Sequence, residues 1–159
     1  MGQVVSRAEL VEARKQCKLQ RKKVVFTNGC FDILHRGHID YLQKAKALGD
    51  VLVVGVNTDD SVKRVKGEKR PIVAEGDRTT ILAAFACVDY VCLFDEDAPY
   101  ELLQAILPDV LVKGADWPLE KVVGKDIIEA AGGSVRTIEL LPHRSTSQII
   151  KTIVERFTS

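Results

Sequence analysis

Short apolar runs alternate along the chain with segments in which apolar residues recur at helical spacing. The clearest run, 51–56, is almost continuously apolar, as expected of a strand buried on both faces of a sheet. The β-prone runs predict strands at 24–27, 51–56, 88–94, 109–113 and 134–138. Helical spacing and capping signals predict helices at about 7–17, 39–48, from Asp59 or Asp60, 77–86, 98–107, 124–131 and from about 146. The first of these helices begins with an S-x-x-E capping box of Ser6 and Glu9. This alternation predicts an α/β fold, a doubly wound parallel sheet of about five strands with helices on both faces.

Length and composition fit one ordinary globular domain. The 159 residues predict a single domain, with a helix and basic lead-in over 1–22 and the core over 23–159. Hydrophobic residues make up 46% and charged residues 28% of the chain. The net charge of +1 argues against a protein that works mainly by holding nucleic acid, for which a strongly basic domain is expected. Six Lys or Arg between Arg14 and Lys23 are better explained as a solvated helix end.

The location expected from the sequence is the cytoplasm. No apolar run approaches the roughly 20 residues that span a bilayer, and Met1–Leu10 lacks the apolar segment of a signal peptide. The four cysteines show neither a C-x-x-C pair nor zinc spacing with histidine. We therefore expect free thiols in a reducing compartment, and no membrane partner.

The most informative motif follows the first strand of the predicted core. Two of the three histidines, His35 and His38, lie three residues apart with Gly37 between them, where a helix is expected to begin. A helix N-terminus offers free N–H groups and partial positive charge to an anion, and imidazole N–H groups can donate to phosphate oxygens. Gly29, in the preceding turn, lets the backbone approach a ligand closely. A metal pair is the weaker interpretation because no third ligand lies nearby.

Three further segments can bind anions or a base at the same edge of the sheet, where ligands of such folds lie. The segment 63–70 holds five cations and is expected to be a basic loop that can reach a triphosphate. In 113–117, Gly114 and the loop amides could read a base, and Trp117 could flank it. In 144–148, Ser145 and Gln148 fit a capping box, and such a helix start is also an anion site. Each segment also has a purely structural explanation: a solvated loop, a capped strand end and a helix cap.

The string from Phe26 to His38, FTNGCFDILHRGH, resembles the H-x-G-H signature of the cytidylyltransferase-like nucleotidyltransferase superfamily. Within it, the chain is most similar to the heptose 1-phosphate adenylyltransferases of ADP-heptose synthesis, over most of the sequence from about Val24 to Phe157. Further matching segments are KRP at 69–71, VDYV at 88–91, FDED at 94–97, PDVLVKG at 108–114 and RST at 144–146. The resemblance implies a Rossmann-like fold.

The resemblance also implies roles for residues of this chain. It places a catalytic lysine on the cationic segment, for which we take Lys66, with Lys63 as the alternative, beside the catalytic His35 and His38. The residues expected to bind the nucleotide are Asn28, Gly29, Cys30, Phe31, Gly37, Lys113, Gly114, Asp116, Arg144, Ser145, Thr146 and Ser147. Asp32 and Arg78 are expected at the sugar phosphate, although Asp32 could as easily orient the turn and Arg78 could be a surface arginine. Ala115 departs from the family's usual glycine, which leaves the shape of that loop open because alanine tolerates positive φ poorly.

The reaction implied is transfer of AMP from ATP to D-glycero-β-D-manno-heptose 1-phosphate, with release of pyrophosphate. Mg²⁺ should accompany ATP, bridging phosphate oxygens rather than filling a protein cage, so no protein metal ligand is assigned. ATP and a sugar 1-phosphate are the expected partners, in a homodimer or higher homo-oligomer that binds no nucleic acid. The alternatives are another enzyme of the superfamily, such as a glycerol-3-phosphate cytidylyltransferase or an FAD synthetase-like enzyme, a non-catalytic nucleotide-binding regulator, and an RNA-binding module.

Overall fold

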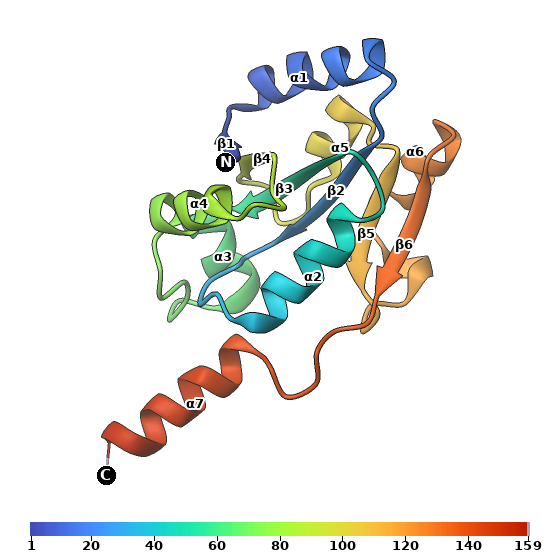
Figure 1. Ribbon diagram of the computed structural model, residues 1–159. Coiled ribbons are helices and arrows are strands. Elements are labelled where there is room, and N and C mark those ends of the chain that lie inside the picture. Colours follow the sequence, from blue (N-terminus) through green and yellow to red (C-terminus); the bar gives the residue numbers. More distant parts are fainter. Residues whose placement is uncertain (159) are drawn as a thin grey trace.

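The computed structural model describes residues 1–158 and contains a six-stranded, all-parallel sheet (Figure 1). Its strands, in the order β1-β4-β3-β2-β5-β6, are bounded as β1 (Gln3–Val4), β2 (Val24–Gly29), β3 (Val51–Asn57), β4 (Tyr90–Phe94), β5 (Val110–Gly114) and β6 (Ser134–Ile138). The helices are α1 (Arg7–Leu19), α2 (Arg36–Lys46), α3 (Asp59–Lys66), α4 (Glu75–Ala84), α5 (Tyr100–Ile106), α6 (Lys125–Ala130) and α7 (Thr146–Phe157), with a 3-10 turn η1 (Leu119–Lys121). The predicted α/β class with a parallel sheet is confirmed.

Alternate residues of each central strand face two separate cores. In β3, Leu52 and Val54 belong to the core under α2 and α4, whereas Val51 and Val53 belong to the core under α1, α5 and α6. Side chains of a strand alternate between the faces of a sheet, so an uninterrupted apolar run fills both cores. This is why the pattern at 51–56 identified a central strand correctly.

The prediction of about five strands missed the edge strand β1. Gln3 and Val4 pair with Tyr90 and Val91 of β4, and the N–H of Gly2 donates to the carbonyl of Ala83 at 2.8 Å. Two residues are too few to show an apolar alternation. Only the approach of the N-terminus to β4 creates this strand.

The segment 63–70 was expected to be a basic loop, but its first half, up to Lys66, is helical. Lys63, Arg64 and Lys66 lie in the last turn of α3, which ends at Gly67 with φ of 98°. Thr58, rather than Asp59 or Asp60, caps this helix: its hydroxyl accepts from the N–H of Ser61 at 3.2 Å. The cations therefore project from a rigid element in fixed directions.

The helix expected at 7–17 is present as α1, with the predicted capping box of Ser6 and Glu9. Its Leu10 and Cys17 are buried in the core with β2, β3 and α5, so this helix is part of the packed structure. By contrast, α7 extends away from the sheet and contains no buried residue (Figure 1). The organisation of the whole sequence as one domain stays a prediction.

The order in which successive strands are added to the sheet reverses between β2 and β5. From β2 it proceeds outward to β3 and β4, then crosses to β5 and β6 on the other side of β2. In a doubly wound sheet, the crevice for a ligand lies at the carboxyl ends of the strands at this reversal. Among residues 1–158, no helix is long and apolar enough to cross a membrane.

Candidate active site

A cavity of about 390 Å³ opens at this crevice. The lining residues that were predicted from the sequence are Asn28, Gly29, Cys30, Phe31, His35, Gly37, His38, Lys66, Lys113, Gly114, Asp116, Arg144, Ser145 and Thr146. They come from the turn after β2, the end of α3, the loop after β5 and the start of α7. The fold thus gathers four distant segments around one cavity.

The two histidines are held by the first turn of α2. His35 is the N-cap, and its Nδ1 accepts from the N–H of Gly37 at 3.1 Å, while Nδ1 of His38 accepts from the N–H of His35 at 3.4 Å. The rings stack with their centroids 4.0 Å apart. Because each Nδ1 is an acceptor, the proton of each neutral ring resides on Nε2. Each imidazole therefore has an Nε2–H group free to donate.

Burial keeps this pair uncharged. Burial, with a smaller contribution from the neighbouring His35, lowers the pKa of His38 to about 4. Burial and the nearby Arg144 also lower the pKa of His35. Both rings are thus neutral hydrogen-bond donors at neutral pH, and positive charge for an anion must come from elsewhere.

The turn before α2 has a shape that few sequences can adopt. Phe31 is buried with φ of 48°, and its ring centroid lies 5.4 Å from that of His38. A Cβ on Gly37 would lie 2.9 Å from the ring of His35 and 3.2 Å from Cβ of Arg144. Left-handed backbone at a non-glycine residue is costly, and such residues cluster at functional sites. The glycine is required here because the histidine ring and the start of α7 occupy the space.

Of the cations in α3, Lys66 is the one that reaches the cavity. Lys63 pairs with Asp60 at 3.3 Å and Arg64 pairs with Asp97 at 2.8 Å. No carboxylate within residues 1–158 lies within ion-pair distance of Lys66. The geometry therefore supports the choice of Lys66 over Lys63.

Lys113 supplies a second positive charge at the floor of the cavity. Its Nζ donates to Oδ1 of Asn28, so the ends of β5 and β2 are joined by a side-chain contact. Burial lowers the pKa of Lys113 to about 8, although the carboxylate of Asp116 opposes this shift. An ammonium group has three donors, and Asn28 accepts one of them. The remaining donors fit an anion such as a phosphate.

The loop after β5 closes the side of the cavity opposite α3. Gly114, Asp116 and Trp117 line it, and Trp117 is 53% exposed. Ala115 does not adopt a positive φ, and its N–H donates to the carbonyl of Ile138 at 2.9 Å. The alanine is thus compatible with the loop, which answers the question that the sequence left open.

The start of α7 forms another wall. Ser145 caps the helix by accepting from the N–H of Gln148 at 3.1 Å, and Thr146 donates to the carbonyl of Ile33 at 3.3 Å. Arg144, Ser145 and Thr146 line the cavity, whereas Ser147 is exposed and does not. The expected contact of Ser147 with a nucleotide stays a prediction.

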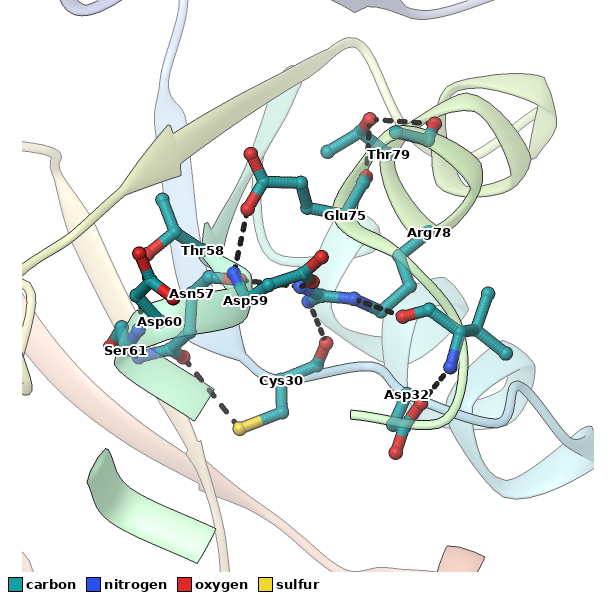
Figure 2. Close-up of polar contacts among 12 residues, drawn as sticks. Cys30, Asp32, Asn57, Thr58, Asp59, Asp60, Ser61, Glu75, Arg78 and Thr79 are labelled. Carbon is teal, nitrogen blue, oxygen red and sulfur yellow. Dashed lines mark hydrogen bonds and ion pairs between the residues drawn. The ribbon is translucent and has the colours of Figure 1, made fainter. Parts of the chain in front are cut away.

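Asp32 and Arg78 also lie outside the cavity lining, contrary to their expected contact with the sugar phosphate. Both side chains are fully buried. The Arg78 guanidinium donates to the carbonyls of Val73, Cys30 and Asn57 and to the carboxylate of Asp59 (Figure 2). These acceptors take four of the five N–H groups of a buried guanidinium, so Arg78 is not a surface arginine, and its expected contact with the sugar phosphate finds no support in this arrangement.

Four lining residues were absent from the predicted nucleotide or catalytic set: Tyr41, Trp117, Leu140 and Leu141. Trp117 was expected only to flank the base. The Tyr41 hydroxyl lies 2.8 Å from that of Thr27, and burial raises the pKa of Tyr41 to about 12. Its position in the helix pattern is that of an ordinary core residue, so no local signal identified it. Leu140 and Leu141 follow β6, and Leu140 approaches Gly114 through the pairing of β6 with β5.

A search of protein families matches residues 26–152 to the cytidylyltransferase-like family. The chain belongs to this family of nucleotidyltransferases. The match includes the histidine turn, the end of α3, the loop after β5 and the start of α7. Every wall of the cavity thus belongs to the matched region.

Curated relatives within this family are bifunctional proteins. The chain is 58% identical over 136 residues to the bifunctional protein HldE of Citrifermentans bemidjiense, covering 86% of this chain and 28% of that protein. It is 49% identical over 157 residues to HldE of Trichlorobacter lovleyi, covering 99% of this chain and 32% of the relative. The chain therefore spans about a third of the length of these relatives.

Solved structures show the same fold. The lipopolysaccharide core biosynthesis protein of Thermoplasma volcanium aligns with a TM-score of 0.63 and 32% identity, covering 77% of this chain and 99% of that one. The pantoate-beta-alanine ligase of Francisella tularensis aligns with a TM-score of 0.64 but 15% identity, covering 100% of this chain and 80% of that one. The second similarity concerns the fold alone.

The arrangement suits the handling of phosphates by a cytidylyltransferase-like enzyme. It combines neutral imidazole donors, two lysines and the N-terminus of α7 around one cavity. Among the described residues, Cys30 is not an activated nucleophile: burial raises the pKa of its thiol, and its Sγ hydrogen-bonds to Oδ1 of Asn57 at 3.9 Å rather than to a base. The site can bind, orient and neutralise phosphates without a covalent intermediate.

Proposed function

We propose that this chain transfers AMP from ATP to D-glycero-β-D-manno-heptose 1-phosphate, releasing pyrophosphate and giving ADP-heptose for lipopolysaccharide core or a related glycan. The observation that carries the proposal is the convergence of His35, His38, Lys66 and the start of α7 on one cavity. The choice of sugar is supported by identity of 49–58% to HldE proteins and by the similarity to a lipopolysaccharide core biosynthesis protein.

In the proposed reaction, a phosphate oxygen of the sugar 1-phosphate attacks the α-phosphorus of ATP in line with the leaving group. The bond from the α-phosphorus to the bridging oxygen breaks, and its electron pair leaves with pyrophosphate. Such transfers depend on positioning and charge stabilisation rather than on covalent catalysis. His35 and His38 donate to the transferred and leaving phosphates, Lys66 bridges phosphates, and Thr146 holds the pyrophosphate end.

The nucleotide is expected to bring its own metal ion. No group of three His, Cys, Asp or Glu side chains among residues 1–158 could hold a metal. The buried Asp32 carboxylate is occupied by donors of the protein, which argues against contact with the ion. Mg²⁺ would be bound mainly by phosphate oxygens and water, where it would neutralise their charge.

The test of the proposed function is a pyrophosphate-release screen of the purified chain. Heptose 1-phosphate with ATP should release pyrophosphate far faster than heptose 1-phosphate with CTP, GTP or UTP. A strong preference for CTP with glycerol 3-phosphate would replace the proposal by a cytidylyltransferase. Binding of ATP by calorimetry without pyrophosphate release from any acceptor would indicate a non-catalytic regulator.

Replacement of His38 tests the role of the histidine pair. His38→Ala should lower kcat by at least about 10²-fold, because it removes a donor to the developing phosphate charge. Circular dichroism and the unfolding midpoint should show that the variant folds. Lys15→Ala, an exposed substitution on α1 outside the cavity lining, is the control and should leave kcat unchanged. Unaltered turnover of folded His38→Ala would exclude the role given to this residue.

The proposed location is the cytoplasm, and the proposed assembly is a homodimer or larger homo-oligomer. The first is supported by four free cysteines and by the supply of ATP there. The second is supported by the family resemblance and by the exposed apolar side chains of Ile153, Val154 and Phe157 on α7. Analytical ultracentrifugation of the whole chain measures the assembly directly.

A further inference from the structure

The segment after α3 is tied to the histidine turn by one buried carboxylate. Asp32 lies three residues before His35 and its side chain has no exposed surface. Its Oδ1 accepts from the N–H groups of Ile72 at 2.9 Å and Val73 at 2.8 Å, and its Oδ2 accepts from Nε of Arg70. We define these four residues as the Asp32 latch.

The latch satisfies a charge that would otherwise be costly to bury. Burial alone would raise the pKa of Asp32, but the hydrogen bonds from Val73, Ile72 and Arg70 outweigh it and lower the pKa below its ordinary value. The carboxylate is thus ionised, and the backbone of 70–73 has a fixed partner. Breaking these hydrogen bonds would leave a buried charge without a partner, which is energetically costly, so the contacts of the latch are stable.

Arg78 holds the same junction from its other side. It donates to the carbonyl of Val73 at 3.0 Å and to that of Cys30, two residues before Asp32 (Figure 2). Val73 is therefore fixed through both its N–H and its carbonyl. The turn that carries the histidines and the segment that follows α3 are joined as one body.

The same contacts fix α3 at both ends. At the start of the helix, Asp59 pairs with Arg78 at 2.8 Å and its N–H donates to Glu75 at 2.6 Å. Past the end of the helix, the N–H of Arg70 donates to the carbonyl of Gly67 at 3.0 Å, which connects the helix end to the latch. Lys66 is the last residue of α3 and lies four positions before Arg70, so the latch holds the chain immediately after this lysine.

From this geometry we infer that Asp32 is a positioning residue, whose buried carboxylate aligns Lys66 with His35 and His38 by holding the segment 70–73. It touches neither the substrate nor the metal ion. The inference rests on the proposed function for its kinetic test. The attachment of the segment 70–73 to Asp32 does not depend on the identity of the acceptor sugar.

The kinetic test is a double-mutant cycle with Asp32→Asn and Lys66→Ala on the full chain. Lys66→Ala alone and Asp32→Asn alone should each lower kcat by roughly 10²-fold, since a misplacement of about 1 Å can cost that much. In the Asp32→Asn background, Lys66→Ala should cost less than about 3-fold, because Lys66 is already out of place. Full additivity of the two losses would overturn the inference. If Asp32→Asn needed a higher Mg²⁺ concentration and the two losses in kcat were additive, the inference would be overturned, and Asp32 would instead act on the metal ion.

Trypsin cleavage under native conditions provides a readout that does not depend on activity. Asp32→Asn should speed cleavage after Lys66 and Lys69 by about 10-fold or more, because the segment after α3 is released (cleavage after Arg70 is blocked by Pro71). Asp60→Asn, which breaks only the exposed pair with Lys63, is the matched control and should change neither cleavage nor the effect of Lys66→Ala. Unchanged cleavage in Asp32→Asn would contradict the latch.

Two further arms keep the test decisive. If Asp32→Asn does not fold, Arg70→Met removes the other charged partner and should show the same coupling and faster cleavage, and their absence would overturn the inference. If wild-type chain releases no pyrophosphate from ATP and heptose 1-phosphate, the proposed function fails. The cleavage experiment then still decides whether the latch exists.

Discussion

At the scale of single residues, the site depends on how burial sets charge. Burial lowers the pKa of His38, which keeps its ring neutral, and lowers the pKa of Lys113, which makes its charged form less stable than in water. Burial of a charge without full pairing costs free energy that the fold must offset elsewhere. Such a cost is acceptable where a ligand with opposite charge will bind, and the position of Lys113 between Asn28 and the cavity suits a phosphate.

Lys113→Met should therefore separate stability from activity. The pKa of Lys113 falls from 10.5 to about 8 on folding, so the unfolded chain binds more protons between these pH values. Wild-type stability should then rise with pH through that window, and at pH 7 the variant should gain up to about 3 kcal/mol in free energy of unfolding while losing kcat/KM. Urea unfolding at pH 7 and pH 10.5 measures this: the gain should vanish at the higher pH. An equal gain at both pH values would show that the buried charge is not its cause.

At the scale of elements, the two ends of the chain behave differently. The helix α1 follows its capping box and buries Leu10 and Cys17, whereas α7 is ordered by its cap and by a contact of Thr146 but buries nothing. Helical stability in proteins comes mainly from the packing of an apolar face. The N-terminal segment that contains α1 is thus part of the packed core, whereas α7 contributes to the cavity only through the residues at its start.

The packing of α1 predicts an effect far from the cavity. Leu10 is 1% exposed, so Leu10→Ala should lower the free energy of unfolding by about 2–5 kcal/mol through lost burial and a remaining cavity. Leu19, in the same helix but 78% exposed, is the matched control, and Leu19→Ala should stay within about 0.5 kcal/mol. Chemical denaturation of both variants tests the difference. Similar values for the two would mean that α1 does not pack as described.

At the scale of the whole molecule, the cavity lies where the two halves of the sheet meet. The histidine turn and Lys66 belong to the half formed by β2, β3 and β4, whereas Lys113 lies at the end of β5 and Arg144 follows β6. A ligand that spans the cavity contacts both halves at once. Its binding should therefore stabilise the entire fold rather than a single loop.

Thermal unfolding with nucleotide tests this statement. Mg²⁺-ATP at about 100 times its Kd should add nearly 2.7 kcal/mol of stability, which for a chain of this size raises Tm by roughly 5–10 °C. Adenosine at the same concentration lacks the phosphates that contact Lys66 and the histidines, so it should raise Tm far less. Equal shifts for ATP and adenosine would argue that the phosphate-binding segments do not act in recognition.

The sequence by itself determined the features that depend on neighbouring residues. Continuous and helical apolar patterns, together with capping signals, identified the central strands and all seven α-helices, although not the 3-10 turn η1. The histidine turn and the caps at Ser6 and Ser145 were also visible, since capping involves residues only a few positions apart.

Only the tertiary structure decided features that depend on distant residues. The two-residue β1 forms because β4 lies beside it, and Tyr41 joins the cavity because α2 crosses β2. The choice of Lys66 over Lys63 depends on the direction of the last turn of α3. Asp32 is negatively charged and Arg78 positively charged whether their partner is a substrate or the protein's own backbone, so the residue types alone do not reveal the partner. Apart from Val73, which lies five positions before Arg78, the partners that occupy them come from segments 19–48 positions away, and such contacts exist only once the chain has folded.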